Sequence, residues 1–412
     1  MTDAARSEPV RGNSAFITGL GIAQICSWGS LYYSFPLIAA AMEVDLGWSK
    51  TELYLGATIG ILLSALVAVP VGAAIDRGHG RWVMAGSSVL AGLLLVAWAH
   101  IEVLSAFYLV MAGIGALRAS TLYEPAFAVI AKRTGPERTR NAITALTLWG
   151  GFASTVFVPL TQVLLDRFGW SGALEVLGGI NLVVCAGLYL AVIDPRKDAP
   201  RAAVVKADIS GHPPLRLALT NPVFWGLAAA FTAYTATFAA FIFHFYPMML
   251  ERGFDAAGVV AAMAIIGPAQ VAGRIAVRMF AREISGRQIG MVTVAVFPIA
   301  MGLLYFSPPQ FWIVALAVLL YGAANGIMTI VRGVVIPEMV SRESYGAING
   351  ALAVPMVLAK AGAPLAAAEI WTVTGSYSAV LAGIIGSSLV MVAAFWCTAW
   401  RAANRHCHQG EA

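Results

Sequence analysis

Five ionisable residues stand inside long apolar segments of this sequence, where their charges would meet lipid rather than water. They are Arg118, Glu124, Arg274, Arg332 and Lys360. A charge near the bilayer centre costs about 2.5–3.5 kcal/mol on insertion scales, so such residues face a protein interior and pair with another charge or with a ligand. Because four of the five are cationic, the pattern favours a site for a small anion.

The depth of each cation separates the candidate ligands. Arg118 lies about 21 Å into its segment at 1.5 Å per residue, and Lys360 is about as deep, so we expect both to bind substrate. Arg274 lies nearer the end of its segment and shares a helical face with Gln270, and we expect both to assist. Alternatives stay open: a salt bridge that only pins helices for Arg118 and Lys360, and a surface anchor for Arg274.

Glu124 and Arg332 are a separate pair. Aligning Gly113 with Gly322, which are 209 residues apart, puts Arg332 beside Glu124 at a similar depth in the two halves of the chain. Six residues separate Arg118 from Glu124, which places them about 120° apart on a regular helix, so we expect them to serve different sites. We expect structural or gating roles for Glu124 and Arg332, and Glu124 is also a proton-coupling candidate.

Apolar runs long enough to cross a membrane carry these residues. Of 412 residues, 59% are hydrophobic and 11% are charged, whereas soluble proteins carry about 25% charged residues. This composition excludes a soluble enzyme or a nucleic-acid-binding protein. A span needs about 20 apolar residues, and twelve runs qualify: 15–42, 51–75, 82–100, 104–131, 141–164, 171–193, 219–249, 256–280, 288–307, 310–336, 346–371 and 377–400.

The basic residues flank these runs unequally. Nineteen Lys and Arg fall on the side of the N-terminus, three fall on the opposite side and four lie inside the runs, which accounts for all 26. Basic residues resist translocation. We therefore expect a multi-pass protein of the inner (cytoplasmic) membrane with both termini in the cytoplasm.

A hydrophilic, proline-containing stretch divides the chain into six plus six spans. We expect a six-helix bundle over 1–195, a cytoplasmic linker over 196–217 and a second six-helix bundle over 218–412. The halves repeat weakly at about 205–211 residues. At matching points Ser49, with Glu52, and Asp255 are predicted to cap the helices that begin there.

The loop after the second run carries the most specific motif. It reads GAAIDRGHGR and contains Gly72, Asp76, Arg77 and Arg81. This resembles the Gly-x-x-x-Asp-Arg-x-Gly-x-Arg signature of the major facilitator superfamily, with its second glycine displaced by one position to Gly78. The resemblance implies an all-α integral membrane fold of twelve helices in two pseudo-symmetric six-helix bundles, with the substrate between them. It also implies a charge relay through these four residues that controls the conformational change.

Within that superfamily, the sequences LGWSKTEL and PVGAAIDRGHGRWVM are most similar to the proton-linked monocarboxylate transporters and the oxalate/formate exchanger. The resemblance to the exchanger implies that Arg274 and Lys360 bind carboxylate, because they lie in the matching helices. No acid follows Asp255 in the eighth run, and the first run lacks the lysine of the animal members. The resemblance therefore assigns no proton carrier.

Aromatic and polar stripes lie on helices that line the cavity in this superfamily. We expect substrate contact from Gln24, Trp28, Tyr32, Tyr33, Tyr234, His244, Gln270 and Asn325, besides Arg118, Arg274 and Lys360. The alternative for a stripe at helical spacing is ordinary packing. His244 is the second proton-coupling candidate, since a histidine can titrate near neutral pH.

Together these features predict a secondary active transporter of a small organic anion, a monocarboxylate or dicarboxylate. It would work by alternating access, by proton coupling or by exchange, since the chain has no nucleotide-binding loop. We expect a monomer in the lipid bilayer with no cofactor, no metal and no nucleic-acid partner. The alternative is an efflux pump of the same superfamily for amphipathic or cationic compounds, against which the positive interior argues. A sensor without transport is a further alternative.

Overall fold

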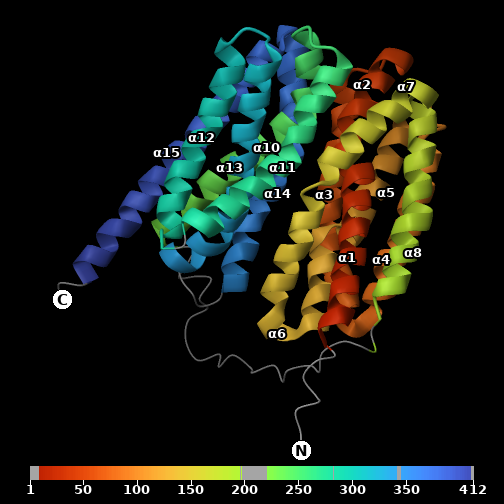
Figure 1. The fold of residues 1–412 in the computed structure, drawn as a ribbon. Coiled ribbons are helices and arrows are strands. Elements are labelled where there is room, and N and C mark those ends of the chain that lie inside the picture. Colours follow the sequence, from red (N-terminus) through yellow and green to blue (C-terminus); the bar gives the residue numbers. More distant parts are fainter. Residues whose placement is uncertain (1–8, 195, 197–219, 282, 341–344, 410–412) are drawn as a thin grey trace, which may run out of the picture. The chain divides into compact units, whose positions relative to one another are not determined.

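The computed structural model describes residues 9–194, 196, 220–281, 283–340 and 345–409 (Figure 1). Every regular element in this part of the chain is a helix. This confirms the all-α prediction, and it follows from the environment, because a helix satisfies its own backbone hydrogen bonds in lipid. The chain divides into two compact units, Met1–Val205 and Lys206–Ala412. The predicted linker, 196–217, lies outside the described residues except for Arg196.

In the described part of the N-terminal unit, eleven elements follow one another. They are α1 (Pro9–Trp28), η1 (Gly29–Tyr33), α2 (Phe35–Leu46), α3 (Lys50–Ala74), η2 (Ile75–His79), α4 (Gly80–Trp98), α5 (Leu104–Thr121), α6 (Tyr123–Gly150), α7 (Ala153–Gly179), η3 (Ile180–Cys185) and α8 (Ala186–Val192), where η marks a π-helical turn. Helix α3 packs on α5, and α1 packs on α6 and α8. A buried core that includes Leu20, Met84, Ile130 and Tyr189 joins α1, α4, α6 and α8.

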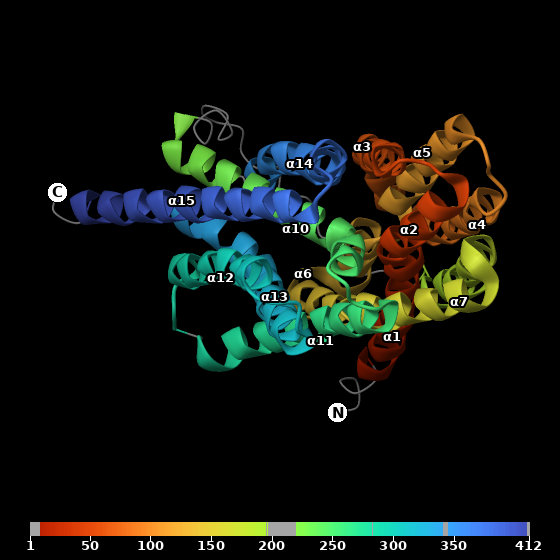
Figure 2. The same cartoon turned by 90° about the horizontal axis from the view of Figure 1, so that it is seen from above.

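Long helices make up the described part of the C-terminal unit (Figure 2). They are α10 (Pro222–Glu251), α11 (Ala256–Phe280), α12 (Gly286–Phe306), α13 (Phe311–Met339), α14 (Tyr345–Thr374) and α15 (Tyr377–Gln409). Helix α10 packs on α14 and α15, while α13 packs on α11 and α12.

Ten helices in the described part are long and apolar enough to cross a membrane, whereas the sequence predicts twelve spans. One of the ten, Ala142–Val192, has 51 residues, more than twice the length that a span needs. Gly169, with φ of 67°, divides it where the fifth and sixth predicted runs meet. The first predicted run, 15–42, contains the π-helical turn η1 and is not among the ten.

The structure confirms the predicted helix caps at matching points of the two units. The Ser49 hydroxyl accepts a hydrogen bond from the Glu52 amide (3.2 Å), and the Glu52 carboxylate accepts one from the Ser49 amide (2.8 Å). The Asp255 carboxylate accepts a hydrogen bond from the Gly258 amide (3.1 Å). Before each cap the preceding helix ends near a glycine with positive φ, Gly47 or Gly253.

The fourth predicted run, 104–131, is not one continuous helix. Helix α5 ends at Thr121 and α6 begins at Tyr123, with Leu122 extended between them (φ −86°, ψ −150°). Pro125 contributes to this break, because it has no N–H to donate to the Thr121 carbonyl four residues earlier. The predicted run still lies within one candidate span, Leu104–Thr134, and the interruption at Leu122 is a feature that the run did not predict.

Candidate functional site

Arg118 lies in the last turn of α5 and is 7% exposed. Its guanidinium carbon stands 4.8 Å from the centre of the Tyr32 ring. Arg118 has no hydrogen bond or ion pair from its side chain to another described residue, although the Glu124 charge acts on it electrostatically. The guanidinium of an arginine carries five N–H donors in a fixed planar fork.

The Tyr32 ring belongs to a group of four aromatic rings, which we call the aromatic cluster: Trp28, Tyr32, Tyr33 and Tyr123. The Trp28 ring centre lies 5.3 Å from that of Tyr32, 6.3 Å from that of Tyr33 and 5.0 Å from that of Tyr123. Three of the rings come from the end of α1 and from η1, as the predicted stripe requires. Tyr123 was not selected from the sequence, and only its position next to Glu124 could have indicated it.

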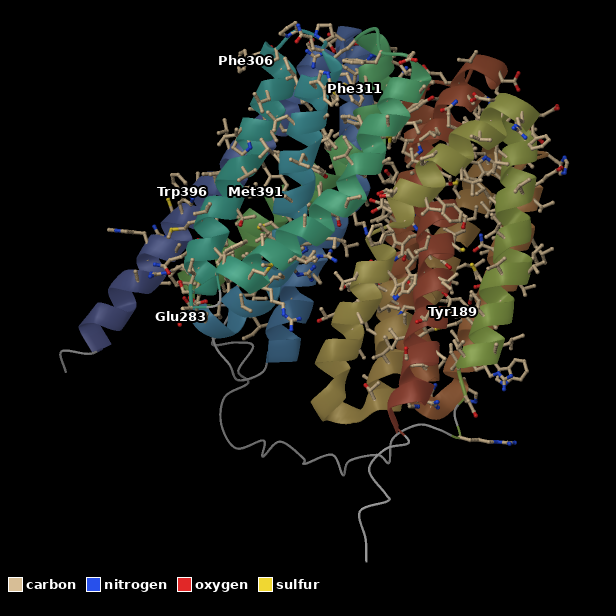
Figure 3. The ribbon with its side chains drawn as sticks, in the orientation of Figure 1. Tyr189, Glu283, Phe306, Phe311, Met391 and Trp396 are labelled. Atoms are coloured by element: carbon tan, nitrogen blue, oxygen red, sulfur yellow. The ribbon has the colours of Figure 1, made fainter. Side chains whose placement is uncertain are left out.

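Gln24, which the sequence stripe places with these rings, is fully buried in the packing of the N-terminal unit. Its Nε2 donates to the Thr121 carbonyl (2.7 Å) and to the Tyr189 hydroxyl (3.1 Å). The Tyr189 hydroxyl in turn donates to the Thr121 carbonyl (3.1 Å), and Figure 3 marks Tyr189 on α8. Sequence reasoning did not select Tyr189, because nothing in the sequence around this tyrosine of the sixth predicted span indicates that it contacts α5.

Glu124 lies in the first turn of α6 and is exposed. An acidic residue is stabilised at a helix N-terminus by the helix dipole, and the break at Leu122 creates that terminus. The expected angle of about 120° between Arg118 and Glu124 assumed an unbroken helix, so it does not apply. Arg332, the other member of this pair, is partly buried on α13.

In the C-terminal unit, His244 is fully buried on α10. Its Nε2 lies 2.8 Å from the Pro364 carbonyl oxygen, and its Nδ1 lies 3.1 Å from the Tyr377 hydroxyl. A carbonyl can only accept, so Nε2 carries the proton and, in the neutral ring, Nδ1 accepts from Tyr377.

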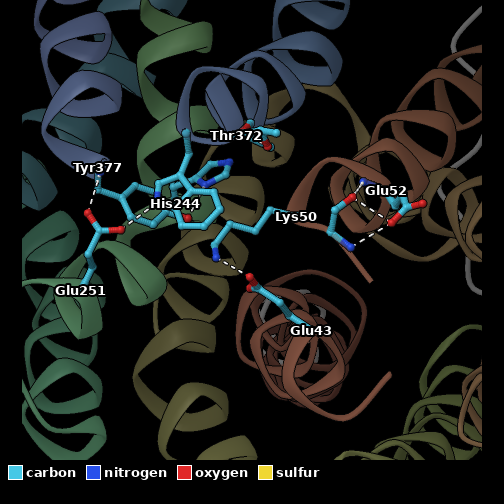
Figure 4. Close-up of polar contacts among 10 residues, drawn as sticks. Glu43, Lys50, Glu52, His244, Glu251, Thr372 and Tyr377 are labelled. Carbon is cyan, nitrogen blue, oxygen red and sulfur yellow. Dashed lines mark hydrogen bonds and ion pairs between the residues drawn. The ribbon is translucent and has the colours of Figure 1, made fainter. Parts of the chain in front are cut away.

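A carboxylate joins the same group of helices (Figure 4). Glu251, at the end of α10, accepts hydrogen bonds from the Trp371 indole (2.6 Å) and from the Tyr377 amide (2.7 Å). Since Tyr377 is the first residue of α15, Glu251 caps that helix. His244 and Glu251 therefore both bind Tyr377, and they tie α10 to α14 and α15.

Tyr234 and Asn325, predicted to face the substrate, meet each other across α10 and α13. The Tyr234 hydroxyl donates to the Asn325 side-chain oxygen. The Tyr234 ring also packs edge-on against Phe297, with centres 5.6 Å apart.

The predicted helpers on α11 lie close to α13. The Arg274 Nε donates to the Gly326 carbonyl (3.4 Å), and Gly326 lies against the backbone of Gln270. Arg274 is partly buried and Gln270 is buried. Lys360 is partly buried on α14, one helical turn before Pro364.

The signature loop forms the π-helical turn η2, which contains Arg77 and follows Gly72 of α3. Gly78 has φ of 97°, a conformation that favours glycine, which explains the displaced glycine of the motif. The Lys132 ammonium donates to the Ile75 carbonyl (3.0 Å) and fixes the turn to α6. Arg81 stacks beside Trp82 (5.8 Å), while the side chain of Asp76 lies outside the described part.

Among the residues whose side chains the structure describes, no group of three His, Cys, Asp or Glu is placed to hold a metal ion. The side chains of His406, Cys407 and His408 lie outside that part.

Residues 20–364 match the family model of the Major Facilitator Superfamily. Monocarboxylate transporter 13 of Bos taurus is 26% identical over 420 residues, which cover 96% of this chain and 93% of that protein. Monocarboxylate transporter 11 of Homo sapiens is 31% identical over 210 residues, 49% of this chain and 43% of that protein. A crystal structure of the nucleoside transporter NupG (D323A mutant) is similar with a TM-score of 0.75 at 15% identity, covering 94% of this chain and 99% of that one.

Proposed function

The chain belongs to the Major Facilitator Superfamily and is a multi-pass membrane transporter rather than an enzyme, and we propose on this premise that its substrate is a small organic anion. The substrate is a monocarboxylate or a dicarboxylate, carried by alternating access across the cytoplasmic membrane. Both termini lie in the cytoplasm, because the basic residues concentrate on that side. The chain works as a monomer, and the gradient of protons or of an exchanged anion drives transport.

The observation that carries this proposal is the environment of Arg118. A guanidinium inside a membrane protein needs a counter-charge or hydrogen-bond acceptors, and no described residue supplies an ion pair. The Tyr32 ring lies beside the cation, and in this proposal the N–H donors of the guanidinium bind the ligand. A carboxylate fits this geometry, because its two oxygens accept two parallel hydrogen bonds from one guanidinium.

The aromatic cluster and the relatives support the same substrate class. Trp28, Tyr33 and Tyr123 are partly buried, and in this proposal they offer apolar surface for the carbon skeleton of a carboxylate held at Arg118. The names of the two curated relatives, both monocarboxylate transporters, favour a single carboxylate. Lys360 and Arg274 are the second-unit ligands in this proposal, and His244 and Glu124 are its proton-coupling candidates.

Ligand-induced thermal shift of the purified protein tests the proposal. We expect small carboxylates to raise the melting temperature of the parent, since a ligand at one hundred times its Kd stabilises by about 2.7 kcal/mol. Arg118→Gln should abolish that shift. The matched control is Arg133→Gln, because the Arg133 guanidinium also stacks on a ring in the same unit, 5.4 Å from the centre of Phe16, and this variant should keep the shift.

Two outcomes contradict the proposal. A carboxylate response that survives in Arg118→Gln removes the proposed ligand. A parent that is stabilised by amphipathic cations and by no carboxylate favours the efflux alternative.

A further inference from the structure

The carbonyl of Thr121 has lost its helical partner. In an unbroken helix the N–H of residue 125 would donate to it, but residue 125 is a proline and has no N–H. An unsatisfied backbone group inside a membrane protein costs several kcal/mol, so other donors must replace it. Thr121 is fully buried, which excludes bulk water as a routine replacement.

Two side chains from other spans replace the missing donor. The Gln24 amide reaches the Thr121 carbonyl from α1 (2.7 Å), and the Tyr189 hydroxyl reaches it from α8 (3.1 Å). The Gln24 Oε1 is buried with no hydrogen-bond partner among the described residues. An unsatisfied acceptor such as this Oε1 is unfavourable. The Thr121 carbonyl can only accept a hydrogen bond, so the Gln24 side chain must turn its NH₂ group, and not its oxygen, toward Thr121.

The first span also contacts Arg118. Within the fourth span, the Arg118 carbonyl accepts a hydrogen bond from the Leu122 amide (3.1 Å), and this is the last backbone hydrogen bond before the break. Span one therefore contacts the end of α5 at two points. Gln24 binds the Thr121 carbonyl, and Tyr32 lies against the Arg118 guanidinium. The direction of the last turn of α5 decides whether the second contact can form.

We propose that the break at Leu122 is a hinge, and that Gln24 and Tyr189 are positioning residues that hold the end of α5 so that Arg118 stays on Tyr32. Its N–H donors then face the carboxylate. This inference rests on the proposed function, in which Arg118 binds the substrate. It goes beyond it by assigning a role to two side chains that do not touch the substrate.

Restoring the missing N–H tests the hinge directly. Pro125→Ala supplies a backbone donor to Thr121 and allows α5 and α6 to join. We expect the Kd for carboxylate to rise at least tenfold while the melting temperature of the ligand-free protein stays equal or rises. Pro159→Ala is the matched control, because Pro159 lies in the part of α7 that precedes Gly169, where the helix continues through the proline, and the Kd of this variant should not change.

Removing the two donors tests the positioning residues. Gln24→Leu and Tyr189→Phe each leave one donor on the carbonyl, so each should raise the Kd by a few-fold. The double variant leaves none and should lose more affinity than the product of the single effects, with a lower melting temperature. Adding Pro125→Ala to it should restore the melting temperature and leave the affinity low.

The outcomes separate the hinge from the proposed function. Pro125→Ala that binds carboxylate like the parent, or that restores both stability and affinity to the double variant, overturns the hinge. Hydrogen exchange of the 118–126 backbone reads the same change without ligand, and slower exchange is expected in Pro125→Ala. If the parent protein binds no carboxylate, the proposed function and the role of Arg118 are both overturned. If Pro125→Ala shows slower hydrogen exchange but an unchanged affinity for carboxylate, only the hinge is overturned.

Discussion

The fourth span and its counterpart in the second half of the chain have different backbones. At the offset of 209 residues that relates Gly113 to Gly322, Pro125 corresponds to Val334 and Arg118 corresponds to Ile327. The first copy breaks at Leu122, whereas α13 runs from Phe311 to Met339 without interruption. The copy that carries a buried cation is therefore the copy whose helix is broken.

The two halves of the chain are alike at the positions where helices begin and end. Ser49 and Asp255 cap the helices that begin after corresponding turns, and Gly47 and Gly253 adopt positive φ before them. The turns and helix caps are therefore alike in the two copies, whereas the backbone inside the fourth span differs from that of α13. This contrast can be tested by exchanging or removing the features that differ.

The largest expected effect comes from giving α13 the proline of the fourth span. Val334→Pro removes the backbone donor to the Ile330 carbonyl and should destabilise the protein by about 3 kcal/mol or more. The melting temperature of the ligand-free protein measures it, with Val334→Ala as the control for lost side-chain volume. An unchanged melting temperature would mean that α13 tolerates a break as the fourth span does, and the contrast between the halves would disappear.

A smaller effect is expected at the ring beneath Arg118. Tyr32→Leu removes the aromatic face and should weaken carboxylate binding about tenfold, since a desolvated cation–π contact is worth up to about 2 kcal/mol. Tyr32→Phe keeps the face and should bind within about twofold of the parent. Titration with carboxylate measures both.

Tyr321→Leu is the comparison for the ring at Tyr32. Tyr321 packs against Phe241, with ring centres 4.3 Å apart in the C-terminal unit, so its loss should lower the melting temperature without changing the Kd. Equal affinity losses in Tyr32→Leu and Tyr321→Leu would show that general packing, and not the cation, explains the effect.

The smallest effects concern the shared caps. Ser49→Ala and Asp255→Ala should each destabilise by about 1 kcal/mol. We expect the larger loss at Ser49, because its hydroxyl accepts a hydrogen bond from the Glu52 amide and donates one to the Glu52 carboxylate, whereas the Asp255 carboxylate accepts one from the Gly258 amide. Thermal unfolding of the two variants and the parent measures which variant loses more stability. A larger loss in Asp255→Ala would contradict the expectation that the capping box at Ser49 stabilises its helix more.

The helical segments could be predicted because their apolar runs are long and have clear starts. The predicted run 256–280 coincides with α11, and 51–75 differs from α3 by one residue at each end. The break at Leu122 could not be predicted from Pro125 alone. Pro247, Pro268 and Pro298 also lie in apolar runs, and α10, α11 and α12 continue through them, so a proline does not decide whether a helix breaks.

Depth indicated Arg118 and an aromatic stripe indicated Tyr32, and the structure brings these two side chains together, while their contact with substrate stays a prediction. The candidate site was not predictable where contacts join distant parts of the chain, since Gln24 and Tyr189 are 165 residues apart. The stripe that grouped Gln24 with Tyr32 also assumed regular α-helical turns. Between them the π-helical turn η1 intervenes, and such a turn adds a residue to the helical repeat and rotates the side chains beyond it about the helix axis.

The shared capping of Thr121 also has a consequence for biogenesis. The fourth span is synthesised well before α8, so during translation its broken backbone has Gln24 as a partner but lacks Tyr189. The Thr121 carbonyl gains its second hydrogen bond only after the sixth span, which carries Tyr189, has entered the membrane. The N-terminal unit is therefore completed by its last helix, and a nascent chain stalled before Tyr189 would hold an unfinished fourth span that is open to membrane quality-control proteases.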